Sequence, residues 1–201
     1  MGSDITPDFG KVLSYGDSAG GYLAIQSGLM RPDFVKAVVA AYPMTYIDSA
    51  WYTVASTGKN PNGSPEVPKE VFEQHVKDTP EGKIVTGAFP PERFPLTMSI
   101  LQSGGFSGLG KDDSLFPARV LEKLSGKENM PFLFTFHGTE DRAVPCGETQ
   151  KFVGKWVEKF GKASVVGKFL EGEDHGFDGE TKLEDGWLQE GLIPVTKAWL
   201  S

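Results

Sequence analysis

The sequence predicts an α/β fold in which a mostly parallel sheet is flanked by helices and carries a helical insertion. Short apolar runs recur along the chain and are continuous rather than alternating, as in strands that are buried on both faces. Segments with helical spacing of apolar residues separate these runs, which is the pattern of βαβ units. One long turn-rich stretch interrupts the alternation, and it predicts the insertion.

The apolar runs and the helical patterns define the expected core elements. Strands are predicted at residues 12–15, 37–42, 131–138 and 164–170. Helices are predicted at residues 19–29, 149–160 and 184–199. In the second helix, Phe152, Trp156 and Phe160 fall on one apolar stripe, which is typical of a helix packed on a sheet. Pro194 is expected to kink or break the last helix.

The interrupting stretch, residues 44–130, is too long to be a simple connection. It contains three helix patterns, at residues 68–78, 93–102 and 114–124. We therefore expect a core formed by residues 1–43 and 131–201, and a helical cap or lid formed by residues 44–130 over one end of the sheet.

Composition and charge exclude several classes of partner. The 201 residues are 39% apolar and 23% charged, which is ordinary for a globular domain. The net charge of −7 disfavours nucleic-acid and anionic-membrane partners. The sequence has no apolar run of about 18 residues and no signal-peptide pattern. Its one cysteine, Cys146, forms no internal disulfide, so we expect a cytoplasmic location.

Residues 16–20 (GDSAG) form a G-x-S-x-G motif between a predicted strand and a predicted helix. This setting is that of a nucleophile elbow, in which a serine occupies a sharp strand-to-helix turn. We predict that Ser18 is the nucleophile and that Gly16 and Gly20 allow strand and helix to pass closely. The N–H of Ala19, at the helix N-terminus, is predicted to face an oxyanion. The alternative is a serine in a glycine-rich turn without catalytic function.

Two other protein families have motifs similar to this one, but their motifs fit this sequence poorly. A dinucleotide-binding loop needs glycine where Ser18 stands. A trypsin-like protease carries G-D-S-G-G in antiparallel sheets with the catalytic histidine before the serine, whereas all three histidines of this chain follow Ser18.

A serine nucleophile needs a histidine base and an orienting acid. His175 follows the fourth predicted strand, where sites of parallel sheets are built, and is the predicted base. His137, at the end of the third strand, is the rival base but is expected to be buried and hydrogen-bonded in place. His75 is expected on a solvated helix face.

The acid is expected after the third strand, and Asp141 fits this position. Glu140 is the nearby rival, and Asp174 and Asp178 are local alternatives beside the base. The order Ser18, Asp141, His175 is the order of an α/β-hydrolase triad.

Four segments together carry a family resemblance: GDSAGGYLA, AAYP, HGTEDRAVP and DHGFD. From about Val12 to its end, the chain resembles the C-terminal part of a fungal-type α/β-hydrolase of the hormone-sensitive-lipase-like esterase group. The resemblance implies a carboxylesterase in which Ser18, Asp141 and His175 act through an acyl-enzyme, with the insertion as the cap.

The sequence departs from this family in one respect. The first four strands of the full fold would precede Phe9, and no H-G-G oxyanion loop occurs in the sequence. We therefore expect a partial fold in which the Ala19 N–H is the remaining oxyanion donor. Losing one such donor costs about 100- to 1000-fold in kcat, so weak activity is expected. The strand at residues 12–15 then becomes a sheet edge. Either the sequence is a fragment of a longer chain, or two copies cover this edge by pairing across a two-fold axis.

Substrate contacts are predicted close to the catalytic end of the sheet, for a small or medium acyl ester. The predicted contact residues are Asp17, Tyr42, Met44, Trp51 and Tyr52. For the aromatic residues, packing between cap and core is the alternative. No H-x-x-x-H or C-x-x-C spacing supports a metal, no cofactor is predicted, and Cys146 is expected to pack as a small hydrophobe.

Two further functions stay open at this point. One is a non-hydrolytic enzyme that uses the Ser-His pair for acid–base chemistry on the same scaffold. The other is a catalytically weak fragment that serves as an interaction module, because fold alone does not decide function.

Overall fold

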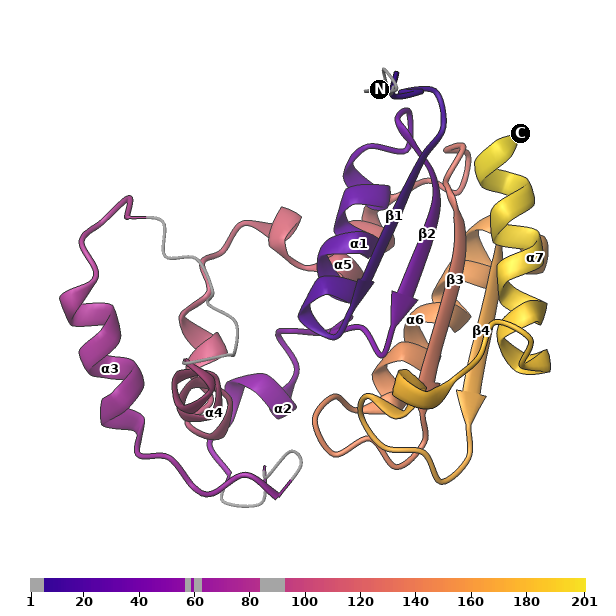
Figure 1. The fold of residues 1–201 in the computed structure, drawn as a ribbon. Coiled ribbons are helices and arrows are strands. Elements are labelled where there is room, and N and C mark those ends of the chain that lie inside the picture. The colour runs from indigo at the N-terminus through magenta and orange to yellow at the C-terminus, as the bar shows by residue number, and fades with distance from the viewer. Residues whose placement is uncertain (1–5, 57–58, 60–62, 84–92) are drawn as a thin grey trace, which may run out of the picture. The chain divides into compact units, whose positions relative to one another are not determined.

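The computed structural model describes residues 6–56, 59, 63–83 and 93–201 of the chain. The chain divides into two compact units, Met1–Thr45 with Asp113–Ser201, and Tyr46–Asp112. Figure 1 labels their elements. The first unit includes the segment 113–130, which the sequence analysis assigned to the insertion.

The first unit is built on a four-stranded parallel sheet. Its strands are β1 (Val12–Asp17), β2 (Val35–Ala41), β3 (Phe132–Gly138) and β4 (Val165–Leu170), in the spatial order β1-β2-β3-β4. Strands β2 and β3 are almost entirely buried, as their continuous apolar runs require. The predicted parallel α/β architecture is therefore confirmed.

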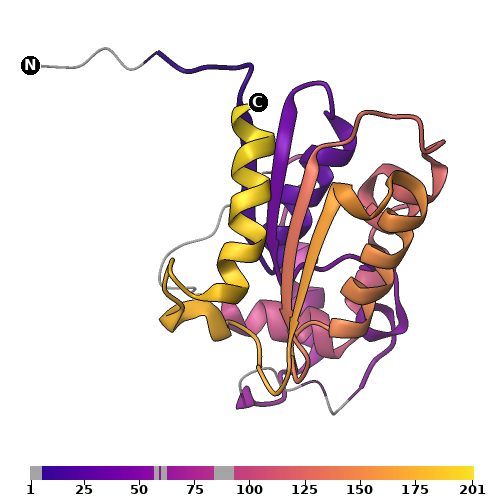
Figure 2. The ribbon, with the colours of Figure 1, turned by 90° about the vertical axis from the view of Figure 1, so that its right-hand side faces the viewer.

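Helices cover both faces of this sheet. On one face lie α1 (Ala19–Met30), α5 (Pro117–Lys123) and α6 (Cys146–Phe160), and on the other lies α7 (Gly186–Leu200) (Figure 2). Short 3₁₀ turns occupy Asp113–Leu115, Lys162–Ser164 and Phe177–Glu180. In α6, Phe152 and Trp156 are buried, in agreement with the predicted stripe.

Pro194 is predicted to kink or break the last helix, but α7 continues through it without a break. A proline inside a helix removes one backbone hydrogen bond. Here the next residue, Val195, is 1% exposed and belongs to the core formed with β2 and β3. The packing of α7 on the sheet outweighs the missing hydrogen bond.

The second unit is helical in the residues that the structure describes. It contains α2 (Ala50–Thr53), α3 (Lys69–Asp78), α4 (Phe94–Gln102) and the 3₁₀ turn Gly105–Gly108. Ser99 of α4 ties the start of α3, because its Oγ donates to the carbonyl of Pro68 at 2.7 Å and accepts the N–H of Phe72 at 3.1 Å. Within the described ranges, no helix is long and apolar enough to cross a membrane.

Candidate active site

Ser18 lies in the turn between β1 and α1, at the carboxyl edge of the sheet. Its backbone has φ 52° and ψ −116°, a region that residues with a side chain rarely adopt. The Ser18 N–H donates to the carbonyl of Ala41 at 2.9 Å, which ties the turn to the end of β2. This strained strand-to-helix turn is the local geometry of a nucleophile elbow.

Gly16 makes the sharp turn sterically feasible, but Gly20 plays a different part from the one predicted. A Cβ at Gly16 would lie 2.2 Å from the carbonyl oxygen of Gly20, whereas a Cβ at Gly20 would meet only Asp17 Oδ1, at 3.6 Å. Strand and helix therefore approach closely only because residue 16 has no side chain. At residue 20 the contact involves backbone atoms, so a side chain there would not disturb it.

The predicted base and acid are joined by a hydrogen bond. His175, after β4, and Asp141, after β3, approach with 2.8 Å between His175 Nδ1 and Asp141 Oδ2. Since a carboxylate only accepts, Nδ1 carries the proton. The other ring nitrogen, Nε2, is then the unprotonated one and is suited to act as a base.

The Asp141 carboxylate is buried and accepts four hydrogen bonds. Its Oδ1 accepts the N–H groups of Ala143 and Val144, each at 2.8 Å, and its Oδ2 lies 3.1 Å from His137 Nε2 in addition to the His175 contact. Burial by itself would raise the pKa of Asp141, but the hydrogen bonds from His137, His175 and Val144 outweigh it and hold the pKa below its ordinary value. Asp141 is therefore ionised at neutral pH.

His137 is a structural partner of Asp141, which the sequence analysis did not foresee. Its side chain is fully buried, with Nδ1 2.9 Å from Thr149 Oγ1 and Nε2 3.0 Å from the carbonyl of Val144. Both ring nitrogens are therefore engaged, which argues against His137 as the base. The available signal was the i,i+4 spacing of His137 and Asp141 at the end of a buried strand.

The loops after β3 and β4 are fastened to each other along their length. The N–H of Glu140 donates to the carbonyl of Glu173 at 3.0 Å, and Arg142 Nε donates to Asp174 Oδ2 at 2.7 Å. Asp174, one of the alternative acids, thus pairs with Arg142 instead of the imidazole. Asp178, the other, accepts the hydroxyl of Tyr42 at 2.9 Å.

The remaining predicted residues are placed as follows. In the part of the chain that the structure describes, no hydrogen bond joins Ser18 Oγ to His175, although such bonds often tighten only when substrate binds. Tyr42 contacts His175, with ring centroids 4.5 Å apart. Met44 is half-buried in the first unit, whereas Trp51 and Tyr52 lie on α2 of the second unit.

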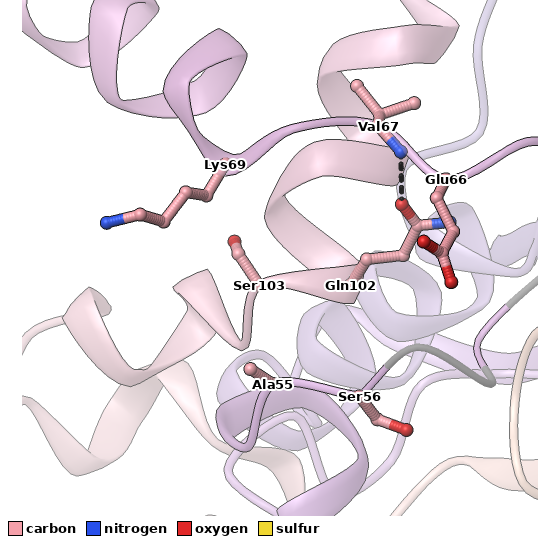
Figure 3. A pocket seen from close by; sticks show the side chains of 7 residues that line it. All are labelled: Ala55, Ser56, Glu66, Val67, Lys69, Gln102 and Ser103. Atoms are coloured by element: carbon pink, nitrogen blue, oxygen red, sulfur yellow. Dashed lines mark hydrogen bonds between the residues drawn. The ribbon is translucent and has the colours of Figure 1, made fainter.

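The second unit contains a pocket of its own, of about 510 Å³ (Figure 3). It is lined by Ala55, Ser56, Glu66, Val67, Lys69, Gln102 and Ser103. Gln102 Oε1 accepts the N–H of Val67 at 2.8 Å and so fixes one wall. Neither Trp51 nor Tyr52 is part of this lining.

Cys146 and the acidic residues do not form a second reactive centre in the described residues. Burial, reinforced by the charge of Asp141, raises the pKa of the Cys146 thiol to about 11, which keeps it protonated. No group of three or more His, Cys, Asp or Glu side chains within these ranges is placed to hold a metal ion.

Comparison with solved structures defines the class of fold. A Staphylococcus aureus protein of unknown function matches with a TM-score of 0.58 and 16% identity, over 92% of this chain and 63% of that one. Thermogutta terrifontis esterase 2 matches with a TM-score of 0.50 and 14% identity, over 94% of this chain and 53% of that one. The fold is that of α/β-hydrolase structures.

Comparison with curated proteins adds two distant relatives, although no family model matches the chain. The chain is 27% identical to probable carboxylesterase M8 of Phoma sp. over an alignment of 199 residues. This alignment covers 96% of this chain and 61% of that protein. The chain is 28% identical over 144 residues to probable carboxylesterase clz11 of Cochliobolus lunatus, which covers 69% of this chain and 65% of that protein. The chain thus spans less than two thirds of either relative.

Proposed function

We propose that the chain is a serine hydrolase, a carboxylesterase for small or medium acyl esters that acts through Ser18, His175 and Asp141. The observation that carries the proposal is the 2.8 Å contact between His175 and Asp141 at the sheet edge where Ser18 occupies a strained turn. The names of the two curated relatives support it. The sequence motifs favour the hormone-sensitive-lipase-like group of esterases.

The proposed reaction has two halves. Ser18 Oγ attacks the ester carbonyl carbon while His175 Nε2 takes its proton, and Asp141 stabilises the imidazolium. The imidazolium then gives this proton to the leaving alcohol oxygen, and an acyl-enzyme remains. In the second half, His175 takes a proton from water, whose oxygen attacks the acyl carbon. The carboxylic acid leaves as the proton returns to Ser18 Oγ.

The N–H of Ala19 is the donor that we assign to the oxyanion. Ala19 is the first residue of α1, so its N–H has no partner within the helix and points along the positive end of the helix dipole. One oxyanion donor is typically worth about 100- to 1000-fold in kcat, so we expect the Ala19 N–H to supply a large part of the proposed catalysis.

For substrate contacts we retain Asp17, Tyr42 and Met44, which all belong to the first unit. Asp17 is exposed beside the nucleophile, and Met44 is partly accessible. Tyr42 is only 5% exposed, so it can offer a substrate little more than the edge of its ring.

A fluorophosphonate probe, read by intact mass, tests the proposal. We expect a single adduct on the wild-type chain and none on Ser18→Ala, followed by hydrolysis of short-chain nitrophenyl esters by the wild type. An adduct without hydrolysis of any ester would favour the non-hydrolytic acid–base enzyme. Absence of the adduct would contradict the proposal and favour an interaction module.

We also propose that two copies of the chain pair through the outer edge of β1. In the described residues β1 pairs with β2 alone, so one row of its backbone groups is unpaired. Tyr15 of this strand is 62% exposed. It borders an apolar groove of about 420 Å³ between β1 and α7, which Leu13, Leu188 and Trp199 also line.

Two charges, Lys11 just before β1 and Asp17 at its end, favour one register for this pairing. An antiparallel pair centred on Ser14 places Lys11 of one copy opposite Asp17 of the other, and Leu13 opposite Tyr15. Alternate residues share a face, and Leu13 and Tyr15 face α7. Lys11 lies on the same side, since its Nζ donates to the carbonyl of Leu200 at 2.8 Å. Opposite charges and apolar pairs directly across antiparallel strands are stabilising.

Light scattering coupled to size-exclusion chromatography tests the dimer. The wild type should elute with twice the mass of one chain, and Asp17→Lys should elute as a monomer because lysines then face each other. The double variant Lys11→Asp/Asp17→Lys, which exchanges the charges, should recover the dimer. A monomeric wild type at all concentrations would contradict the proposal.

A further inference from the structure

Tyr42 occupies an unusual position at the end of β2. Its φ is 34°, and the described residues contain only one other non-glycine residue with a positive φ, Ser18. Its N–H donates to the carbonyl of Phe136 on β3 at 2.7 Å. Its chain neighbour Ala41 accepts the N–H of Ser18 at 2.9 Å. A strained residue that persists is over-determined by its surroundings and often marks a functional site.

The side chain of Tyr42 links the base to the rest of the loop that carries it. The ring lies against His175, with centroids 4.5 Å apart and planes inclined by 58°. Its hydroxyl donates to Asp178 Oδ1 at 2.9 Å. Phe136 and Phe177 pack on the same ring, at centroid distances of 6.3 and 6.4 Å. Tyr42 thus lies between the sheet, the imidazole of His175 and Asp178.

We propose that Tyr42 is a positioning residue for the imidazole of His175, and that Asp178 holds the Tyr42 ring in place. The inference rests on the proposed function, because it assigns His175 the part of the base. The hydrogen bond to Asp141 fixes the Nδ1 edge of the His175 imidazole, but the ring can still rotate about the axis of this hydrogen bond. The Tyr42 ring, packed against the imidazole at a centroid distance of 4.5 Å, restricts this rotation.

The segment that carries the base needs this support. His175 lies between Gly172 and Gly176, which both have positive φ, and outside regular secondary structure. On its other side the segment is held by Asp174, which pairs with Arg142 and accepts the N–H of His175 at 2.8 Å. In the described residues, Tyr42 is the one aromatic ring that packs against the imidazole, at a centroid distance of 4.5 Å.

The charges around the imidazole are Asp141, Asp174 with its partner Arg142, and Asp178, which is reached through the Tyr42 hydroxyl. Burial, together with the hydrogen bond to Asp178, raises the pKa of Tyr42 well above its ordinary value. The Tyr42 hydroxyl therefore stays protonated at neutral pH and can donate its hydrogen bond to Asp178.

Matched variants separate positioning from general core packing. Tyr42→Leu removes the ring, and Tyr42→Phe keeps the ring but removes the hydrogen bond to Asp178. Phe134→Leu is the control, because Phe134 is fully buried in the same core cluster and no contact joins it to His175 in the described residues. Tyr42→Leu and Phe134→Leu should lower the melting temperature to a similar degree.

Two readouts are needed. The first is the rate of fluorophosphonate labelling of Ser18. Tyr42→Leu should lower this rate about 100-fold, Tyr42→Phe about threefold to tenfold, and Phe134→Leu less than twofold. The second is the low-field proton NMR signal of His175 Nδ1–H, which needs no catalysis. It should be lost in Tyr42→Leu and kept in the other two variants.

The second readout distinguishes the two proposals. If the wild type fails to react with the probe, but its low-field signal is present and is lost only in Tyr42→Leu, the positioning role stands and the hydrolase proposal falls. If Tyr42→Leu keeps the signal, if Phe134→Leu loses it equally, or if the wild type lacks it, the positioning role is overturned.

Discussion

Asp141→Asn is expected to lower the rate of Ser18 acylation about 10⁴-fold while the chain stays folded. The amide oxygen can still accept the N–H groups of Ala143 and Val144. The amide NH₂ then replaces the oxygen that faces His175 Nδ1. To accept this donor, the imidazole must move its proton from Nδ1 to Nε2, and a protonated Nε2 cannot take the proton of Ser18. The rate of fluorophosphonate labelling at pH 7 measures the loss.

Asp174→Asn is the matched control, one residue before the base. It weakens the pair with Arg142 but leaves the contact between His175 and Asp141 unchanged. Because Asp174 is partly exposed, the change in labelling rate should stay within about tenfold. If both substitutions reduced the rate equally, Asp141 would have no special part as the orienting acid.

Asp141→Asn should also change how the stability of the fold depends on pH. The folded-state pKa of Asp141 is lowered, so its ionised form stabilises the fold above the ordinary aspartate pKa of about 3.9, and this stability is lost as pH falls towards the folded value. The difference in free energy of unfolding between wild type and Asp141→Asn should therefore be largest near neutral pH and shrink below about pH 4. Urea titrations at several pH values measure it, and a difference independent of pH would contradict the prediction.

The strands and the elbow could be predicted because their signals are local. Residues 37–42 are a continuous apolar run and residues 131–136 are interrupted only by Thr135, and burial on both faces is the main reason for such runs. The turn at Ser18 needs only small neighbours between a strand and a helix. Chain order then brings the segment after β3 to the segment after β4, because neighbouring parallel strands end at the same edge.

The details that tune the site could not be predicted, because they depend on tertiary contacts. The sequence does not say that Asp141 is shared by His137 and His175, nor that the Tyr42 ring packs against the imidazole. Pro194 is a second case in which tertiary contacts decide the outcome. Local propensity predicts a kink or a break, whereas α7 packs on the sheet and continues through this residue. Local patterns thus define the elements, and packing decides which side chains meet.

Gly16→Ala is expected to destabilise the chain by about 3 kcal/mol or more, because the added methyl overlaps backbone atoms. The new Cβ would lie 2.2 Å from the carbonyl oxygen of Gly20 and 2.4 Å from its carbonyl carbon. Neither atom belongs to a flexible side chain, so relief requires α1 to move away from β1. That movement opens the turn at Ser18, and we expect the loss of probe labelling together with the loss of stability. Chemical unfolding and labelling on the same preparation measure both.

Gly20→Ala makes this prediction specific, because it changes the other glycine of the same five-residue motif. Its Cβ would make only an ordinary contact, 3.6 Å from Asp17 Oδ1, and alanine favours a helix over glycine by about 1 kcal/mol. Gly20→Ala should therefore be neutral or slightly stabilising, opposite in sign to Gly16→Ala. If both variants lost stability equally, the close approach would not be the reason that glycine is needed at Gly16. The requirement would then lie in the backbone freedom of the whole turn.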